Sequence, residues 1–266
     1  MKNRRAISKK RIGRVVIKIG TSLLTRDGGH LDRPRVASFA RELSQINKSG
    51  VQVVLVSSGA IAAGMGELGW KKRPSELAKK QAAAAVGQPK LMETYRQFFR
   101  RHGVKVAQVL VTRDDFENPA RRKNAQHTLL SLIAEKVIPI INENDTVAVE
   151  EIRMGDNDNL AARVAAKVKA DLLILLTDVD GLMTRPPHHG KGKLIPRVNR
   201  ITAQIEALAH DTHGTDGGSG GMRTKISAAK LSTRRGVPMV IANGKKPGII
   251  ALLVAGQPAG TYFTPR

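Results

Sequence analysis

The chain has 266 residues, 41% of them hydrophobic, which allows one large α/β core or at most two small ones and argues against global disorder. It contains no cysteine, which excludes disulfides, thiolate metal sites and a cysteine nucleophile. Lysine and arginine number 45 against 22 aspartates and glutamates, and the formal net charge of +23 favours anionic ligands.

The N-terminal segment is basic but lacks the pattern of a secretory signal. Seven of the first fourteen residues are Lys or Arg, and no apolar segment stands ahead of a cleavage site. No apolar run in the chain approaches the roughly 18 residues of a membrane-spanning helix. We therefore expect a cytoplasmic protein without membrane contact, with a basic arm at residues 1–13.

Short apolar runs alternate with longer amphipathic segments along the rest of the chain. The sequence predicts strands at residues 15–19, 51–56, 104–111, 137–141, 172–176 and 238–242, and helices at 33–48, 75–101, 120–135, 160–169, 203–209 and 225–235. Near-continuous apolar runs are typical of parallel strands covered on both faces. The alternation therefore predicts an αβα sandwich, an α/β fold with a mostly parallel central sheet.

The loops at the carboxyl ends of the strands are the expected place for ligands in such a sheet. The first predicted strand leads into residues 18–22, Lys-Ile-Gly-Thr-Ser. A lysine followed by a glycine and two hydroxyls suits phosphate binding, because the backbone can approach closely and the ammonium neutralises charge. Small residues at 57–64, after the second strand, either admit a ligand to the backbone or form a close-packed turn into a helix.

Carboxylates and amides gather in two later loops, against the basic trend of the chain. Residues 142–145 are Asn-Glu-Asn-Asp, and residues 155–159 are Gly-Asp-Asn-Asp-Asn, just ahead of a predicted helix. Asp or Asn in that position caps a helix by accepting free backbone N–H groups. The same groups can also hold a metal, orient lysines or bind a polar substrate. Thr177 and Asp178 follow the fifth strand.

A glycine-rich segment opens the last predicted helix and contains a second lysine, Lys225. No GxxxxGK[ST] motif occurs, which disfavours a P-loop fold. Phosphoryl transfer without a covalent intermediate needs such groups: two lysines on glycine-rich loops and a cluster of carboxylates and amides. The charge on the transferring group must be neutralised, and donor and acceptor must be held in line.

Six ordered motifs, at residues 18–22, 57–64, 141–145, 155–160, 176–178 and 220–225, resemble those of the amino acid kinase family, and most closely its glutamate 5-kinase branch. The resemblance runs from about residue 14 to 264, so we expect a kinase domain at 14–266. It implies an αβα sandwich. It also implies ATP-dependent phosphorylation of the γ-carboxylate of L-glutamate to L-glutamyl 5-phosphate, the first step of proline biosynthesis.

The resemblance implies a role for individual residues. Lys18 and Lys225 would stabilise the transferring phosphoryl group, and Asp158 would orient both lysines. The implied substrate-binding residues are Ser58, Gly59, Asp145 and Asn157. The implied nucleotide-binding residues are Lys18, Gly20, Thr177, Asp178, Ser219, Gly220, Gly221, Met222, Arg223, Thr224 and Lys225.

The resemblance also implies cofactors and partners. ATP is expected together with Mg²⁺, which would bind mainly through ATP, since no protein side chain is assigned to the metal. L-glutamate is the expected acceptor, proline a feedback inhibitor, glutamyl phosphate reductase a partner, and a homo-oligomer the expected assembly. Many family members have a C-terminal PUA domain; none is expected here, because the chain stops at Arg266.

Two alternatives stay open. An acetylglutamate, aspartate or uridylate kinase would share the fold and the lysines, although the acidic, amide-rich loop at 142–145 favours an acceptor with an ammonium group over a nucleotide. A basic nucleic-acid-binding protein on this scaffold would use the positive charge. Aromatic residues, on which bases stack, make up only 3% of the chain, so we favour the kinase.

Overall fold

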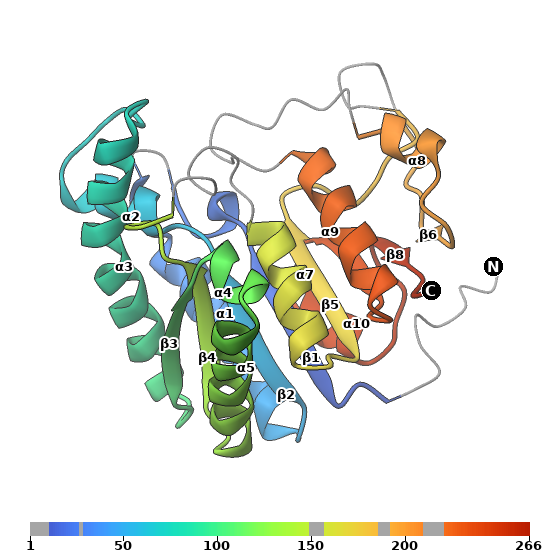
Figure 1. Cartoon of the computed structure of the whole chain (residues 1–266), viewed down its shortest axis with the longest axis horizontal. Helices are drawn as coiled ribbons and strands as arrows, with labels where there is room; N and C mark the ends of the chain where they lie inside the picture. Colours follow the sequence, from blue (N-terminus) through green and yellow to red (C-terminus); the bar gives the residue numbers. More distant parts are fainter. Residues whose placement is uncertain (1–10, 27–28, 149–156, 186–191, 210–220) are drawn as a thin grey trace.

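Within the described residues, one eight-stranded sheet forms the centre of the molecule (Figure 1). The computed structural model describes residues 11–26, 29–148, 157–185, 192–209 and 221–266. In spatial order, the strands are β3 (Val106–Val111), β4 (Ile138–Glu143), β2 (Gln52–Ser57), β1 (Arg14–Ile19), β5 (Leu172–Thr177), β7 (Met239–Asn243), β8 (Thr261–Phe263) and β6 (Arg197–Val198). All neighbours are parallel except β7 and β8. The predicted α/β class with a mostly parallel sheet is confirmed.

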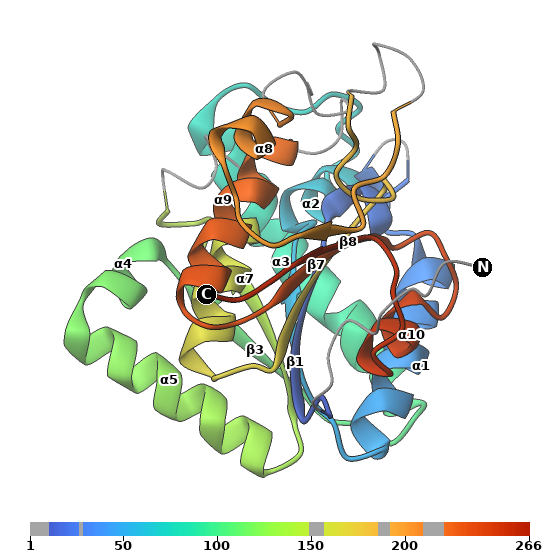
Figure 2. The ribbon, with the colours of Figure 1, turned by 90° about the vertical axis from the view of Figure 1, so that its right-hand side faces the viewer.

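Helices cover both faces of the sheet. They are η1 (Thr21–Leu23), α1 (Arg33–Lys48), α2 (Ala60–Glu67), α3 (Leu77–Arg100), α4 (Arg113–Glu117), α5 (Pro119–Ala134), α7 (Asn157–Lys167), α8 (Ala203–Ala207), α9 (Met222–Arg234) and α10 (Ile249–Val254). Seen edge on, the sheet has α5, α7 and α9 on one side and α1 and α10 on the other (Figure 2). In the described ranges, no helix combines the length and hydropathy that a membrane span requires.

Alternation along β1 divides the core into two layers. Val15, Ile17 and Ile19 are buried in one hydrophobic cluster with residues of α1, α3 and α10, whereas Val16 is buried in a second cluster with residues of α5, α7 and α9. Successive side chains of a strand point to opposite faces of the sheet. Lys18 therefore points to the side of the sheet on which α7 and α9 lie.

The six predicted strands and six predicted helices all form, but several ends differ. Strand pairing continues past the apolar runs into polar residues at the carboxyl ends, namely Ser57, Asn142, Glu143, Thr177 and Asn243. Helices α7 and α9 begin at Asn157 and Met222, earlier than predicted, because polar residues are well accommodated in a first turn, where backbone N–H groups lack intrahelical partners. The short elements η1, α4, α10, β6 and β8 were not predicted, and α2 confirms the turn into a helix that was one of two interpretations of residues 57–64.

The boundary between the predicted basic arm and the kinase domain stays a prediction. Residues 1–10 lie outside the described ranges, and the described structure begins at Arg11. From Arg14 onward, the chain contributes to the central sheet.

Helices α2 and α3 touch along a strip of small residues. A Cβ atom added at Gly64 would lie 1.7 Å from the carbonyl oxygen of Ala83, and one added at Gly87 would lie 1.9 Å from the carbonyl oxygen of Ala60. Both distances are far below van der Waals contact. The two helix backbones would have to separate to admit any side chain at either position.

We expect Gly64→Ala to lower the free energy of unfolding by about 3 kcal/mol, the upper end of the usual cost of overpacking. Denaturant unfolding followed by circular dichroism measures it. The matched control is Gly66→Ala in the same helix, where the nearest contact of an added Cβ is 3.1 Å, to Nδ1 of His30. Equal free energies of unfolding for the two variants would contradict the packing argument.

Candidate active site

Polar side chains collect where four neighbouring strands end. Lys18 lies near the end of β1, Ser57 ends β2, Asn142 and Glu143 end β4, and Thr177 ends β5. Strands β4, β2, β1 and β5 are consecutive in the sheet, so these parallel strands bring their carboxyl ends to one edge. A crevice at this edge is the general ligand-binding place of open parallel sheets.

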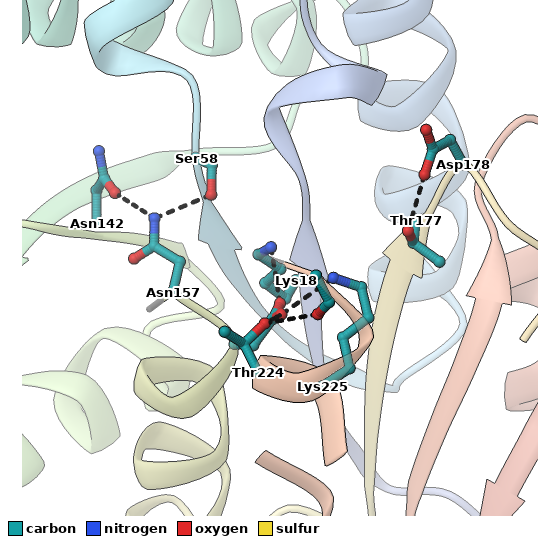
Figure 3. Close-up of polar contacts among 10 residues, drawn as sticks. Lys18, Ser58, Asn142, Asn157, Thr177, Asp178, Thr224 and Lys225 are labelled. Atoms are coloured by element: carbon teal, nitrogen blue, oxygen red, sulfur yellow. Dashed lines mark hydrogen bonds and ion pairs between the residues drawn. The ribbon is translucent and has the colours of Figure 1, made fainter. Parts of the chain in front are cut away.

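Two lysines share one buried carboxylate at this edge (Figure 3). Nζ of Lys18 lies 2.8 Å from Oδ1 of Asp158, and Nζ of Lys225 lies 3.1 Å from Oδ2. The hydroxyl of Thr224 donates a hydrogen bond of 2.8 Å to the same Oδ2. Three elements supply these groups: β1, the first turn of α7 and the first turn of α9. The structure thus brings together the three predicted catalytic residues.

The two ammonium groups determine the ionisation of Asp158. Its side chain is fully buried, and burial alone would raise its pKa. The charges of Lys18 and Lys225, with hydrogen bonds from Lys18 and Thr224, outweigh burial and hold the pKa of Asp158 well below its ordinary value. The carboxylate is therefore ionised at neutral pH, and two cations facing one anion leave an excess positive charge for an anionic ligand.

The N-terminus of α9 adds backbone donors to the same place. The residue before its first turn is Gly221, which has no side chain to cap the free N–H groups of the helix. Such a terminus favours anions. Met222 is buried at the first turn, and Arg223 is exposed. Ser219 and Gly220, both predicted nucleotide-binding residues, lie outside the described residues.

A second polar group lies beside the lysines and consists of Ser58, Gln88, Asn142 and Asn157, called the amide network here. Nδ2 of Asn157 donates to Oγ of Ser58 at 2.9 Å and to Oδ1 of Asn142 at 3.0 Å (Figure 3). Nδ2 of Asn142 donates to Oε1 of Gln88 at 2.9 Å. Oδ1 of Asn157 is buried and finds no hydrogen-bond partner among the described residues. An acceptor in that state is able to receive a hydrogen bond from a ligand.

Asp145 lies in the loop after β4. Burial raises the pKa of its carboxyl to about 6, and the charge of Arg73 pulls in the opposite direction. The structure records no hydrogen bond between Asp145 and the amide network. Its assignment as a substrate-binding residue therefore stays a prediction.

The two predicted glycines play different parts. Gly59 precedes α2 with φ of +105°, a conformation that other residues rarely adopt, so the backbone itself requires glycine. Gly20 has an ordinary φ of −75°. A Cβ atom there would lie 3.7 Å from Nζ of Lys18. The small residue keeps free the space next to that ammonium.

Thr177 and Asp178 lie at the end of β5, on the opposite side of Lys18 from the amide network (Figure 3). The hydroxyl of Thr177 donates to Oδ1 of Asp178 at 3.1 Å. Nearby, Asp180 pairs with Lys246 at 2.8 Å and accepts from Asn243 at 3.0 Å. Asn243 ends β7, Lys246 follows that strand, and Gln88 lies in the middle of α3. No sequence motif singles out any of the three.

The described residues contain no group of three or more His, Cys, Asp or Glu side chains placed to hold a metal ion. The absence of a dedicated protein ligand for the metal stays a prediction.

The sequence matches the model of the amino acid kinase family over residues 13–243. Similar curated proteins include the glutamate 5-kinase of Moorella thermoacetica, 52% identical over 99% of this chain and 69% of its own length. The glutamate 5-kinase of Symbiobacterium thermophilum is 49% identical over 94% of this chain and 95% of its own length.

Among solved structures, the UMP kinase from Bacillus anthracis is similar, with a TM-score of 0.64 over 96% of this chain and 97% of that chain. The two sequences are only 17% identical. This similarity therefore concerns the fold, and it places the sheet, its order and its covering helices among known architectures.

Proposed function

The chain belongs to the amino acid kinase family, and we propose that it transfers the γ-phosphoryl group of ATP to the γ-carboxylate of L-glutamate. The product is L-glutamyl 5-phosphate, the first intermediate of proline biosynthesis. The observation that supports this most strongly is the buried pair Lys18 and Lys225 on one carboxylate. Beside it lies an amide network whose Asn157 acceptor has no partner among the described residues. The first feature suits a phosphoryl group, and the second an amino acid.

The reaction needs little covalent help from the protein. The γ-carboxylate of glutamate is already an anion, so its oxygen can attack the γ-phosphorus without a general base. The bond from phosphorus to the β,γ-bridging oxygen breaks, and ADP leaves with the electron pair. Negative charge spreads over the transferring oxygens, and fixed cations stabilise it most effectively when they need no reorganisation. Asp158 holds Lys18 and Lys225 in that state.

The α-amino and α-carboxylate end of glutamate would bind at the amide network. Oδ1 of Asn157 would accept from the ammonium group, since it lacks a partner among the described residues. Ser58 already accepts from Asn157, so its own O–H remains able to donate to the α-carboxylate. Proline, which also has an α-carboxylate and an ammonium group, would fit the same pair as an inhibitor.

ATP would bind with its phosphates between Lys18 and the start of α9, and with its nucleoside toward Thr177 and Asp178. Residues 219–225 complete this proposed nucleotide site. Mg²⁺ would enter with ATP and supply neutralisation of the phosphate charge. A homo-oligomeric assembly and a reductase that takes up the labile product stay predictions.

The proposal is tested by incubating the protein with ATP, Mg²⁺ and L-glutamate and trapping acyl phosphate with hydroxylamine. We expect glutamyl hydroxamate to form well above the levels given by L-aspartate or N-acetyl-L-glutamate. A product no greater than with L-aspartate would overturn the assignment of glutamate. Such a result would instead favour another kinase activity of the family, or the nucleic-acid-binding alternative.

The pH dependence of kcat/KM for glutamate tests the role of Asp145. Its pKa of about 6 means that the carboxyl is protonated below that pH and negative above it. Only the negative form attracts the substrate ammonium, so kcat/KM is expected to fall as the pH drops through about 6 and to be level above it.

Asp145→Asn should lower kcat/KM at pH 8 by about tenfold and remove the inflection. The control for the removed charge is Asp114→Asn, an exposed carboxylate in α4. If kcat/KM of Asp145→Asn still fell at the same pH as that of the wild type, the titrating group would be a residue other than Asp145.

A further inference from the structure

A buried glutamine on α3 ends the amide network. Gln88 is 8% exposed, and its Oε1 accepts from Nδ2 of Asn142. We propose that Gln88 is a positioning residue. Through Asn142, it fixes the amide of Asn157 with its oxygen toward the substrate, and thereby makes the site select acceptors that have an ammonium group. The inference rests on the proposed function and concerns how the same site recognises its acceptor.

A backbone N–H and Gln88 together hold the orientation of Asn142. The N–H of Glu143 can only donate, and it lies 2.9 Å from Oδ1 of Asn142. The atom facing this N–H must therefore be oxygen, and the amide nitrogen must point the other way. There it meets Oε1 of Gln88, an acceptor that satisfies the buried NH₂ group.

The orientation of Asn157 follows from that of Asn142. The atom of Asn157 that faces Oδ1 of Asn142 must be a donor, so it is Nδ2. The second hydrogen of Nδ2 is used by Oγ of Ser58. Both amide hydrogens are then engaged with protein, and Oδ1 remains as a buried acceptor without a partner among the described residues. The reverse orientation would set two carbonyl oxygens against each other.

The chemical consequence is a site of defined polarity. Asn157 presents an acceptor, and Ser58 presents a donor. An α-amino acid supplies the opposite pair, a positively charged donor and a negatively charged acceptor. A dicarboxylate without the amino group, such as glutarate, leaves the acceptor of Asn157 buried and unpaired, and that penalty gives the discrimination.

The close contact of α2 and α3 explains how Gln88 reaches this position. Gly64 and Gly87 let the two helix backbones meet without side chains between them. Gln88 follows Gly87 directly, and α2 begins just after Ser58 and Gly59. The same contact therefore places both ends of the amide network, Gln88 and Ser58, next to β4.

Loss of the acceptor at position 88 would leave the buried NH₂ of Asn142 unsatisfied. Asn142 would then turn toward another acceptor or admit water, and the orientation of Asn157 would no longer be fixed. We expect Gln88→Met, which keeps the length and removes the acceptor, to raise KM for L-glutamate about tenfold. KM for ATP and kcat should change much less.

The decisive readout is selectivity, measured as the inhibition constant of glutarate divided by KM for L-glutamate. This ratio should fall about tenfold in Gln88→Met. Gln88→Glu, which keeps an acceptor at the same place, should restore most of it. The matched control is Gln81→Met on the same helix, where the side chain is partly exposed and contacts the backbone oxygen of Thr146 at 3.4 Å.

Two results would overturn the inference. One is an unchanged selectivity ratio in a Gln88→Met protein that unfolds at the wild-type temperature. The other is an equal loss for glutamate and glutarate that Gln88→Glu does not repair, which would indicate a purely structural residue. Failure of the proposed function looks different, because the wild-type protein would then form no glutamyl hydroxamate at all.

Discussion

Replacing Lys18 with methionine is expected to lower kcat by about 10³-fold, while the dissociation constant of ATP changes only a few-fold. Methionine keeps the length of the side chain and removes the charge. Lys18 is 7% exposed and held by Asp158, so its ammonium is preorganised for charge that grows in the transition state. Stopped-time hydroxamate assays give kcat, and titration calorimetry gives the dissociation constant.

The control for a removed lysine is Lys79→Met, because Lys79 pairs with Glu76 on the surface of α3. Its kcat should equal that of the wild type. Asp158 keeps Lys225 and Thr224 as partners in Lys18→Met, so the variant should fold. Near-normal turnover in a folded Lys18→Met protein would remove Lys18 from the catalytic machinery.

Asp158→Asn is expected to affect both stability and turnover. The change leaves two buried ammonium groups facing each other without their shared counter-charge. Breaking a buried ion pair by removing one partner costs about 3–5 kcal/mol. The lysines would also shift from their positions, so kcat should fall by at least about 10²-fold. Chemical denaturation and the hydroxamate assay measure the two effects.

The stability effect of Asp158 has a defined pH window. Its folded-state pKa lies well below the ordinary value, so the ionised form stabilises the fold at every pH above the unfolded pKa of about 3.9. The difference in unfolding free energy between wild type and Asp158→Asn should be constant from about pH 5 to 8 and shrink as the pH falls below about 4.

The surface pair of Asp180 and Lys246, with side chains 48% and 57% exposed, gives a comparison. Asp180→Asn should change stability by no more than about 1 kcal/mol. If Asp158→Asn proved no more destabilising than Asp180→Asn, the shared carboxylate would not have the role assigned to it.

The positions of site residues could be predicted where the apolar pattern defines an element and polar residues stand at its end. Lys18 could be placed at a strand end and Lys225 at a helix start because apolar runs and glycines delimit those elements. The pairing of both lysines with Asp158 could be expected only through the family resemblance, since no spacing rule links residues so far apart in the chain. The structure confirms their contact at 2.8 and 3.1 Å.

Gln88 and the short strands could not be predicted for physical reasons. In the sequence, Gln88 is one polar residue on an amphipathic helix, and its partner Asn142 stands in what reads as a loop. Their hydrogen bond depends on helix packing that Gly64 and Gly87 permit, a tertiary property. Strand β6 has two residues and β8 has three, too few for a periodic signal.

The most direct test of the central claim follows one oxygen atom. L-glutamate labelled with oxygen-18 in both γ-carboxylate oxygens is incubated with the wild-type protein, ATP and Mg²⁺. When glutamyl phosphate cyclises through its own amino group, phosphate leaves with the bridging oxygen. Attack of the carboxylate on the γ-phosphorus predicts one oxygen-18 atom in each phosphate released, read by mass spectrometry. Unlabelled phosphate, formed at the same rate with and without glutamate, would contradict the account.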